Sequence, residues 1–232
     1  PAANSLESPF IAGTARYVSD VSNANSGISL ALQRDVSTGA YRIALHVMQA
    51  SSATGVHSTI SVSLDEWQHI GASYDPASDT VRFYLNGELA ETKTNVTLPQ
   101  WVPADGNALV IGAQAFYSMT AATYSYAHGF AGSIADVRVY NTAVDANTIA
   151  ERYDQSLTGS ETGLVGWYPM NGGDGVAADS SNVGNHGYLA GNAALDGVVQ
   201  YVQEGGSIAV SGFSITDIDA GDGTITATLS AA

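Results

Sequence analysis

Oxygen-bearing side chains gather in a short glycine-containing segment, residues 179–187 (DSSNVGNHG). Asp179, Asn182 and Asn185 offer carboxylate and amide oxygens, and glycine lets such a segment fold tightly on itself. A calcium ion in a protein takes about six to eight oxygen ligands of these kinds. The segment therefore predicts a calcium site. The alternative is a glycine-rich turn whose Asp and Asn side chains only accept hydrogen bonds from backbone amides.

A second acidic run, formed by Asp217, Asp219 and Asp222, lies close to the end of the sequence. In an extended segment the first two carboxylates point to the same side, and Gly221 allows the third to turn back toward them. This arrangement predicts calcium binding in the intact protein. The alternative is an acidic turn that is exposed to solvent.

Aromatic residues are most frequent in residues 113–128 (AQAFYSMTAATYSYAH). Sugar-binding sites use aromatic faces together with a few polar groups. This segment and the loop before it supply the candidate ligand-binding residues Trp101, Tyr117, Tyr124, Tyr126 and His128. The alternative is that these rings only cover the edge of a β-sheet.

Patterns typical of catalysis are missing from the sequence. A glycoside hydrolase needs two carboxylates on either side of the bond that it cleaves. Asp65 and Glu66 are adjacent, so they point to opposite faces of a strand, and Asp217 and Asp219 lie in a predicted loop. The five histidines show no ligand spacing and are expected to be packed or solvated: His46, His57, His69, His128 and His186. We therefore expect no catalytic residues and a protein that is not an enzyme.

Composition narrows the class of protein further. The net charge of −15 repels phosphate groups and argues against nucleic-acid binding. No apolar run is long enough for a membrane span. The absence of cysteine excludes disulfides and favours a bacterial protein over a eukaryotic extracellular one. The first residues lack the basic and apolar regions of a signal peptide, so we expect the sequence to be cut from a longer polypeptide.

Residues 65–90 (DEWQHIGASYDPASDTVRFYLNGELA) predict two strands followed by a hairpin. Alternation over residues 67–74 and 81–85 indicates antiparallel strands with one face toward solvent. Asn86-Gly87 suits a two-residue turn, because both central residues of such a turn adopt positive φ. EWQHIGASYD and VRFYLNGELA together resemble the central motif of the laminin-G-like, concanavalin A-like jelly-roll domains of secreted and cell-surface proteins.

Two later stretches resemble the same family. FAGSIADVRVYN, at residues 130–141, is expected to form a strand, and Asp145 then predicts the N-cap of one short helix. LVGWYPMNGGDGVAADSSNVGNHGYL, at residues 164–189, resembles a further family motif, while residues 113–128 predict a long loop or a distorted hairpin. Apolar runs predict the other strands, at residues 28–32, 41–48, 57–64 and 109–112.

The resemblance covers most of residues 10–196 and implies an all-β fold for residues 1–196: a two-sheet antiparallel jelly-roll sandwich with one short helix. It also implies that the segment 179–187 helps to hold a structural calcium ion. Asp174 can substitute for an acidic pair of the family that falls on Asn171-Gly172 here. A strand aspartate of the family falls on Ala135, which is a departure from the pattern.

Residues 197–232 are expected to form a linker and a partial cadherin-like β-sandwich repeat. EGGSIAVSGFSITDIDAGDGTITATLS resembles the opening of the cadherin-like or immunoglobulin-like repeats of large bacterial adhesins. A full sandwich of this kind needs about 100 residues, so the repeat is only begun. The resemblance implies calcium at the junction, near Asp217 and Asp219.

These observations lead to one functional hypothesis and two alternatives. The hypothesis is a monomeric, non-enzymatic, carbohydrate-binding module of a secreted or cell-surface bacterial adhesin, with structural calcium and with neighbouring domains in a longer chain. Its partner is a glycan or another cell-surface ligand, and neither nucleic-acid binding nor membrane insertion is expected. The alternatives are a spacer domain without a ligand and a binding appendage of a secreted carbohydrate-active enzyme.

Overall fold

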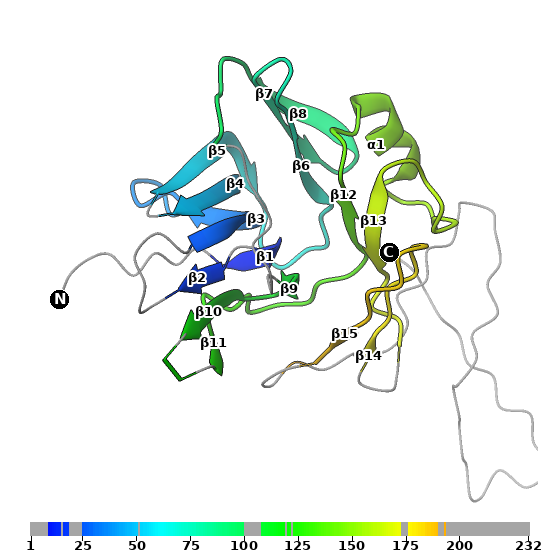
Figure 1. The fold of residues 1–232 in the computed structure, drawn as a ribbon. Helices are drawn as coiled ribbons and strands as arrows, with labels where there is room; N and C mark the ends of the chain where they lie inside the picture. The colour runs from blue at the N-terminus through cyan, green and yellow to red at the C-terminus, as the bar shows by residue number, and fades with distance from the viewer. Residues whose placement is uncertain are drawn as a thin grey trace, which may run out of the picture. The chain divides into compact units, whose positions relative to one another are not determined.

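The computed structural model describes residues 9–14, 16–18, 25–50, 52–99, 108–118, 120–121, 123–172, 176–189 and 193. The chain divides into two units, Pro1–Tyr201 and Val202–Ala232, and the second lies wholly outside the described residues (Figure 1). The predicted cadherin-like repeat therefore stays a prediction. Within the described part of the chain, no helix is long and apolar enough to cross a membrane.

The described part of the first unit is mostly β, as the sequence predicts, with one short helix. The larger sheet has eight strands: β1 (Phe10–Gly13), β2 (Arg16–Val18), β3 (Asn25–Arg34), β4 (Tyr41–Ala50), β5 (Ser52–Val62), β9 (Val110–Ile111), β10 (Gln114–Ser118) and β11 (Thr123–Ala127). A second sheet has three strands: β6 (Ile70–Asp75), β7 (Thr80–Leu85) and β8 (Glu88–Lys93). Two short pairs complete the strands: β12 (Val137–Tyr140) with β13 (Leu164–Tyr168), and β14 (Val176–Ala177) with β15 (Gly187–Tyr188).

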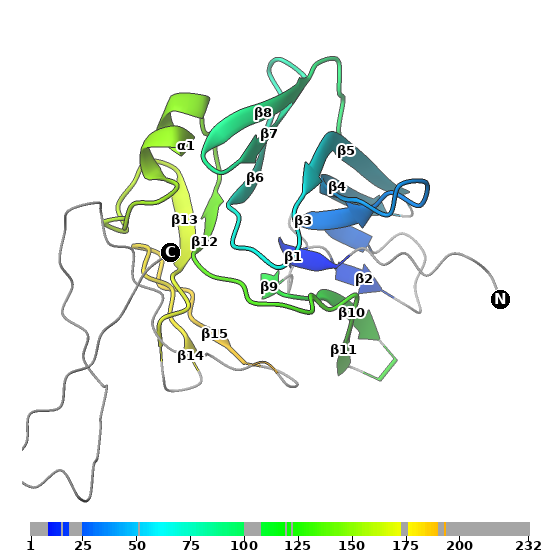
Figure 2. The same cartoon turned by 180° about the vertical axis from the view of Figure 1, so that it is seen from behind.

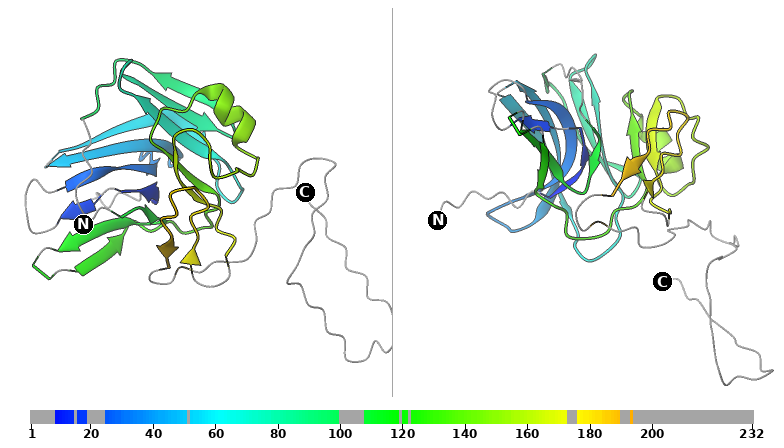
Figure 3. Two further views of the ribbon diagram at one scale, coloured as in Figure 1. Left: turned by 45° about the vertical axis from the view of Figure 1, so that its right-hand side comes forward. Right: turned by 60° about the horizontal axis from the view of Figure 1, so that its bottom comes forward.

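The two larger sheets pack face to face around one apolar core, which gives the antiparallel sandwich (Figures 2 and 3). On β4, Ile43, Leu45 and Val47 point to one side because strand residues alternate between faces. They meet Val81 and Phe83 of β7, both of which are fully buried. Each such side chain contributes roughly 1.5–3 kcal/mol through burial, so this layer is the main source of stability.

Local sequence signals position the turns between these strands. Asn86 and Gly87 have φ values of 49° and 79°, which confirms the predicted hairpin turn. The carboxylate of Asp145 accepts a hydrogen bond from the backbone N–H of Thr148 at 3.0 Å, which confirms the predicted cap of α1 (Ala146–Arg152). Asp35 accepts from Ser37 in the predicted turn between β3 and β4.

Three predicted elements differ from the structure in their extent. The strand expected from Trp67 begins only at Ile70, because His69 donates its backbone N–H to the Asn86 side chain and not to a neighbouring strand. The strand expected over residues 130–141 is limited to β12, because Asp136 has a positive φ of 52°, which interrupts an extended run. Of the two alternatives predicted for residues 113–128, the hairpin is confirmed, but β10 and β11 pair in a regular register and not as a distorted hairpin.

Two glycines with positive φ allow a matched test of how the hairpin packs on α1. Gly87→Ala adds a methyl group that would lie 2.2 Å from the Tyr153 ring, whereas Gly39→Ala, with φ of 76°, has only a guanidinium nitrogen at 3.9 Å. We expect Gly39→Ala to lose about 1 kcal/mol of unfolding free energy through backbone strain. Gly87→Ala should lose about 2–4 kcal/mol, because overpacking adds to the strain. Urea unfolding of both variants measures the difference, and equal losses would contradict this packing.

Candidate functional site

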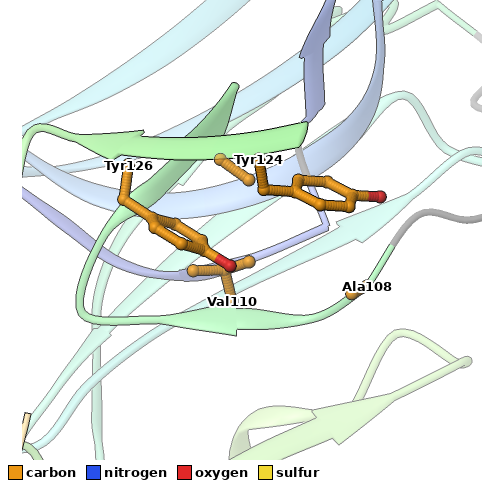
Figure 4. A pocket seen from close by; sticks show the side chains of 5 residues that line it. Ala108, Val110, Tyr124 and Tyr126 are labelled. Carbon is orange, nitrogen blue, oxygen red and sulfur yellow. The ribbon is translucent and has the colours of Figure 1, made fainter. Parts of the chain in front are cut away.

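Tyr124 and Tyr126 project from the same side of β11, since they are two residues apart in a strand (Figure 4). The hairpin register places Tyr126 opposite Ala115 and Tyr124 opposite Tyr117. Both rings are open to solvent, with exposed fractions of 43% for Tyr124 and 50% for Tyr126. About half of the surface of each residue is thus available for contact with a ligand.

The two tyrosines line a shallow cavity of about 60 Å³ together with Ala108, Val110 and Ala115. Figure 4 shows both rings extending from β11 toward the segment that carries Val110 and Ala108. The alternation Tyr-Ser-Tyr is a visible sign of a strand with two rings on one face. Sequence reasoning missed the three smaller residues: Val110 lies on β9, Ala115 lies on β10, and Ala108 lies two residues before β9, so only the fold brings them together.

Of the other three predicted ligand-binding residues, only His128 has a described side chain, and it is not among the described residues that line the cavity. His128 is exposed, and its ring lies 6.2 Å from the rings of both Phe10 and Phe116, centroid to centroid. Its carbonyl oxygen also accepts the backbone N–H of Phe10 at 3.0 Å, so this residue anchors the start of β1. Trp101 and the side chain of Tyr117 lie outside the described residues. The assignment of all five to a sugar site stays a prediction.

Asp179 organises the segment that the sequence predicts to bind calcium. Its Oδ1 accepts the backbone N–H groups of Trp167 and Ser181, both at 2.9 Å, and its Oδ2 accepts that of Asn185 at 2.8 Å. A carboxylate has about four positions for accepting hydrogen bonds, so three are occupied. Asp179 is 5% exposed, and the contacts give it the role of a cap between β13 and the segment after β14.

Electrostatics agree with this role for Asp179. Burial on its own raises the pKa of the carboxyl group, but the donated N–H groups of Trp167, Ser181 and Asn185 outweigh it and hold the pKa below 3.8. The side chains of Asn182 and Asn185 are exposed beside it. Asp174, Asp217, Asp219 and Asp222 lie outside the described residues.

No calcium site is assembled from three acidic or histidine side chains in the part of the chain that the structure describes. Backbone carbonyls and amide side chains also bind calcium, so this finding does not decide the matter. Calcium binding at the segment 179–187 and at the acidic run near the end of the chain stays a prediction.

Comparison with known proteins places this geometry in a family. Residues 8–150 match the model described as the concanavalin A-like lectin/glucanases superfamily. A structure from Bacteroides ovatus, described as that of a candidate carbohydrate binding protein, is similar at 15% identity with a TM-score of 0.49, over 84% of this chain and 58% of that chain. An S-layer domain-containing protein from Clostridium thermocellum is similar at 21% identity with a TM-score of 0.32, over 62% of this chain and 61% of that chain. This chain thus spans less than two thirds of either structure, and no curated protein matches its sequence.

Asp179→Asn tests whether the carboxylate caps the backbone or binds an ion. The variant turns an N–H group toward the Asn185 N–H, so we expect a loss of about 1–3 kcal/mol of unfolding free energy at pH 7. The folded-state pKa is depressed, so the stabilisation is present above the unfolded pKa and is lost as the pH falls through the folded value. The gap between wild type and variant should therefore close toward acid pH, while Asp154→Asn, at an exposed position, serves as control.

Urea unfolding with and without a calcium chelator separates the two roles. A cap made of backbone N–H groups keeps its effect in the chelator. If the chelator lowers the wild-type stability to that of Asp179→Asn, the carboxylate acts through calcium and the capping role is wrong.

Proposed function

Because this chain belongs to the concanavalin A-like lectin/glucanases superfamily, we propose that it is a non-enzymatic module that binds carbohydrate on the surface formed by Tyr124 and Tyr126. The observation that carries the proposal is the pair of exposed tyrosines on one face of β11, above an apolar cavity. Large apolar rings in solvent cost free energy unless a ligand covers them, and sugars present C–H faces that pack on such rings.

The dimensions favour a chain of sugars over a single enclosed one. Residues i and i+2 of a strand are about 7 Å apart, which allows two neighbouring rings to contact successive parts of an extended ligand. The cavity of about 60 Å³ is far smaller than the several hundred Å³ of a pocket that encloses a small molecule. A ligand would therefore lie across the tyrosines, and specificity would come from polar groups around them.

The lining of the cavity supports binding without hydrolysis. Glycoside hydrolysis needs an acid and a second carboxylate beside the scissile bond. The five described residues that line the cavity are alanines, a valine and tyrosines, none of which carries a carboxylate. Of the two activities in the family's description, this surface therefore favours the lectin type.

The wider context of the proposal rests on the sequence. An acidic chain without cysteine, followed by a stretch that resembles adhesin repeats, favours a secreted or surface-exposed bacterial adhesin. Structural calcium belongs to this proposal, and its candidate ligands are Asp174, Asp179, Asn182, Asn185 and the acidic run near the end of the chain.

A glycan array tests the proposal. The wild-type chain should bind a defined set of oligosaccharides, and the double variant Tyr124→Ala/Tyr126→Ala should lose most of that binding. Each aromatic contact contributes about 0.5–1.5 kcal/mol, so each single variant should weaken binding by about two- to tenfold. Tyr188→Ala is the matched control, because Tyr188 is 82% exposed but lies on β15, outside the cavity.

The outcomes separate the alternatives. Binding that survives in the double variant would place the sugar site elsewhere on the molecule. A folded wild-type chain that binds no glycan would favour the spacer hypothesis. Running the array with a calcium chelator shows whether the ion takes part in recognition.

A further inference from the structure

Two histidines that are eleven residues apart in sequence face each other across neighbouring strands. His46 lies on β4 opposite Gly55 of β5, and His57 lies on β5 opposite Ala44 of β4, so the two form a diagonal pair. Their Nε2 atoms are 3.4 Å apart, and the rings meet edge to face with an interplanar angle of 89°. This pair is distant in strand order from the tyrosine hairpin and plays no part in the proposed sugar site.

The separation of the two nitrogens is that of ligands on one metal ion. Zinc–imidazole bonds of about 2.0–2.1 Å at a tetrahedral angle put two nitrogens about 3.3–3.4 Å apart. An ordinary hydrogen bond from a ring N–H is shorter, at about 2.7–3.2 Å between heavy atoms. The pair is thus slightly too wide for a good hydrogen bond and correctly spaced for chelation.

The charged side chain that acts on His57 is Lys93, and its Nζ is paired with a carboxylate oxygen of Glu91 at 2.9 Å. This pairing offsets part of the positive charge beside the two rings.

Gly55 leaves room beside the rings. A methyl group at this position would lie 2.6 Å from Cδ2 of His46 and 2.9 Å from Nε2 of His57. Any larger residue would therefore displace both rings. His57 and Gly55 are exposed, so an ion can reach the pair from solvent.

We propose that His46 and His57 form a two-histidine binding site for a divalent transition-metal ion, zinc by its geometry, with water completing the coordination. Imidazole nitrogen suits zinc, copper and nickel, and it is a poor ligand for calcium and magnesium. The net charge of −15 raises the local concentration of cations of every kind, but only ions with a preference for nitrogen gain from this pair.

Zinc titration of the complete 232-residue chain by calorimetry tests the site. We expect saturable binding of one ion that falls at least about tenfold in affinity in His46→Gln and in His57→Gln. His186→Gln is the control, because His186 only accepts a backbone N–H from Asp179, which the glutamine oxygen can replace. The control should keep the wild-type affinity.

Gly55→Ala tests the geometry without removing a ligand. Its methyl group pushes the two rings apart, so zinc affinity should fall as well, while circular dichroism should show an unchanged fold. In the wild type, Cu²⁺ should broaden the ring signals of His46 and His57 in NMR spectra before those of the other three histidines. Absence of saturable zinc binding, or equal affinity in all variants, would overturn the proposal, and neither result would bear on sugar binding at the tyrosines.

Discussion

The packing of β12, β13 and α1 against one another depends on one buried ion pair, Asp136 with Arg138. Their side chains are 7% and 12% exposed, and Arg138 contacts both carboxylate oxygens through two nitrogens. Charges this deeply buried are stable only when they are paired and their remaining hydrogen-bond positions are filled. That condition is met, because Asp136 also accepts the Trp167 indole N–H at 2.7 Å, and Arg138 donates to the carbonyls of Arg152 and Gln155.

This network fixes three elements at once. Asp136 immediately precedes β12, and Arg138 lies within it. Trp167 belongs to β13. The two carbonyls belong to Arg152, the last residue of α1, and to Gln155, three residues after it. With α1 held in this way, the Tyr153 ring lies against Gly87 of the hairpin turn and 5.8 Å from the His69 ring. Residues 65–90, which resemble the family's central motif, are therefore in contact with the end of the short helix that follows the second motif.

The features that could be predicted from the sequence are those that depend on residues close together in the chain. The Asn86-Gly87 turn and the Asp145 cap depend on neighbouring residues, and both are confirmed. Alternation correctly predicted that β6 and β7 pair antiparallel, but the expected solvent-facing side was wrong: Tyr84 is 1% exposed, and its hydroxyl donates to the carbonyl of Val144. The missed features depend on residues distant in sequence: His69 forgoes a strand hydrogen bond for the Asn86 side chain, and the tyrosine cavity needs Val110 from another strand. The histidines looked scattered for the same reason, since only the β4–β5 register shows that His46 and His57 are neighbours.

The tyrosines and His57 lie on strands at the ends of the described sheet. There β11, β9 and β5 each pair with one other strand, and β4 carries the apolar core on one face and His46 on the other. An edge strand with solvent-exposed side chains contributes little to the core, so its surface residues are free to change. Tyr124, Tyr126 and His57 are all exposed and stand outside the core between β4 and β7. Stability in this region is therefore carried by the core between β4 and β7, whereas the two proposed sites use residues outside that core.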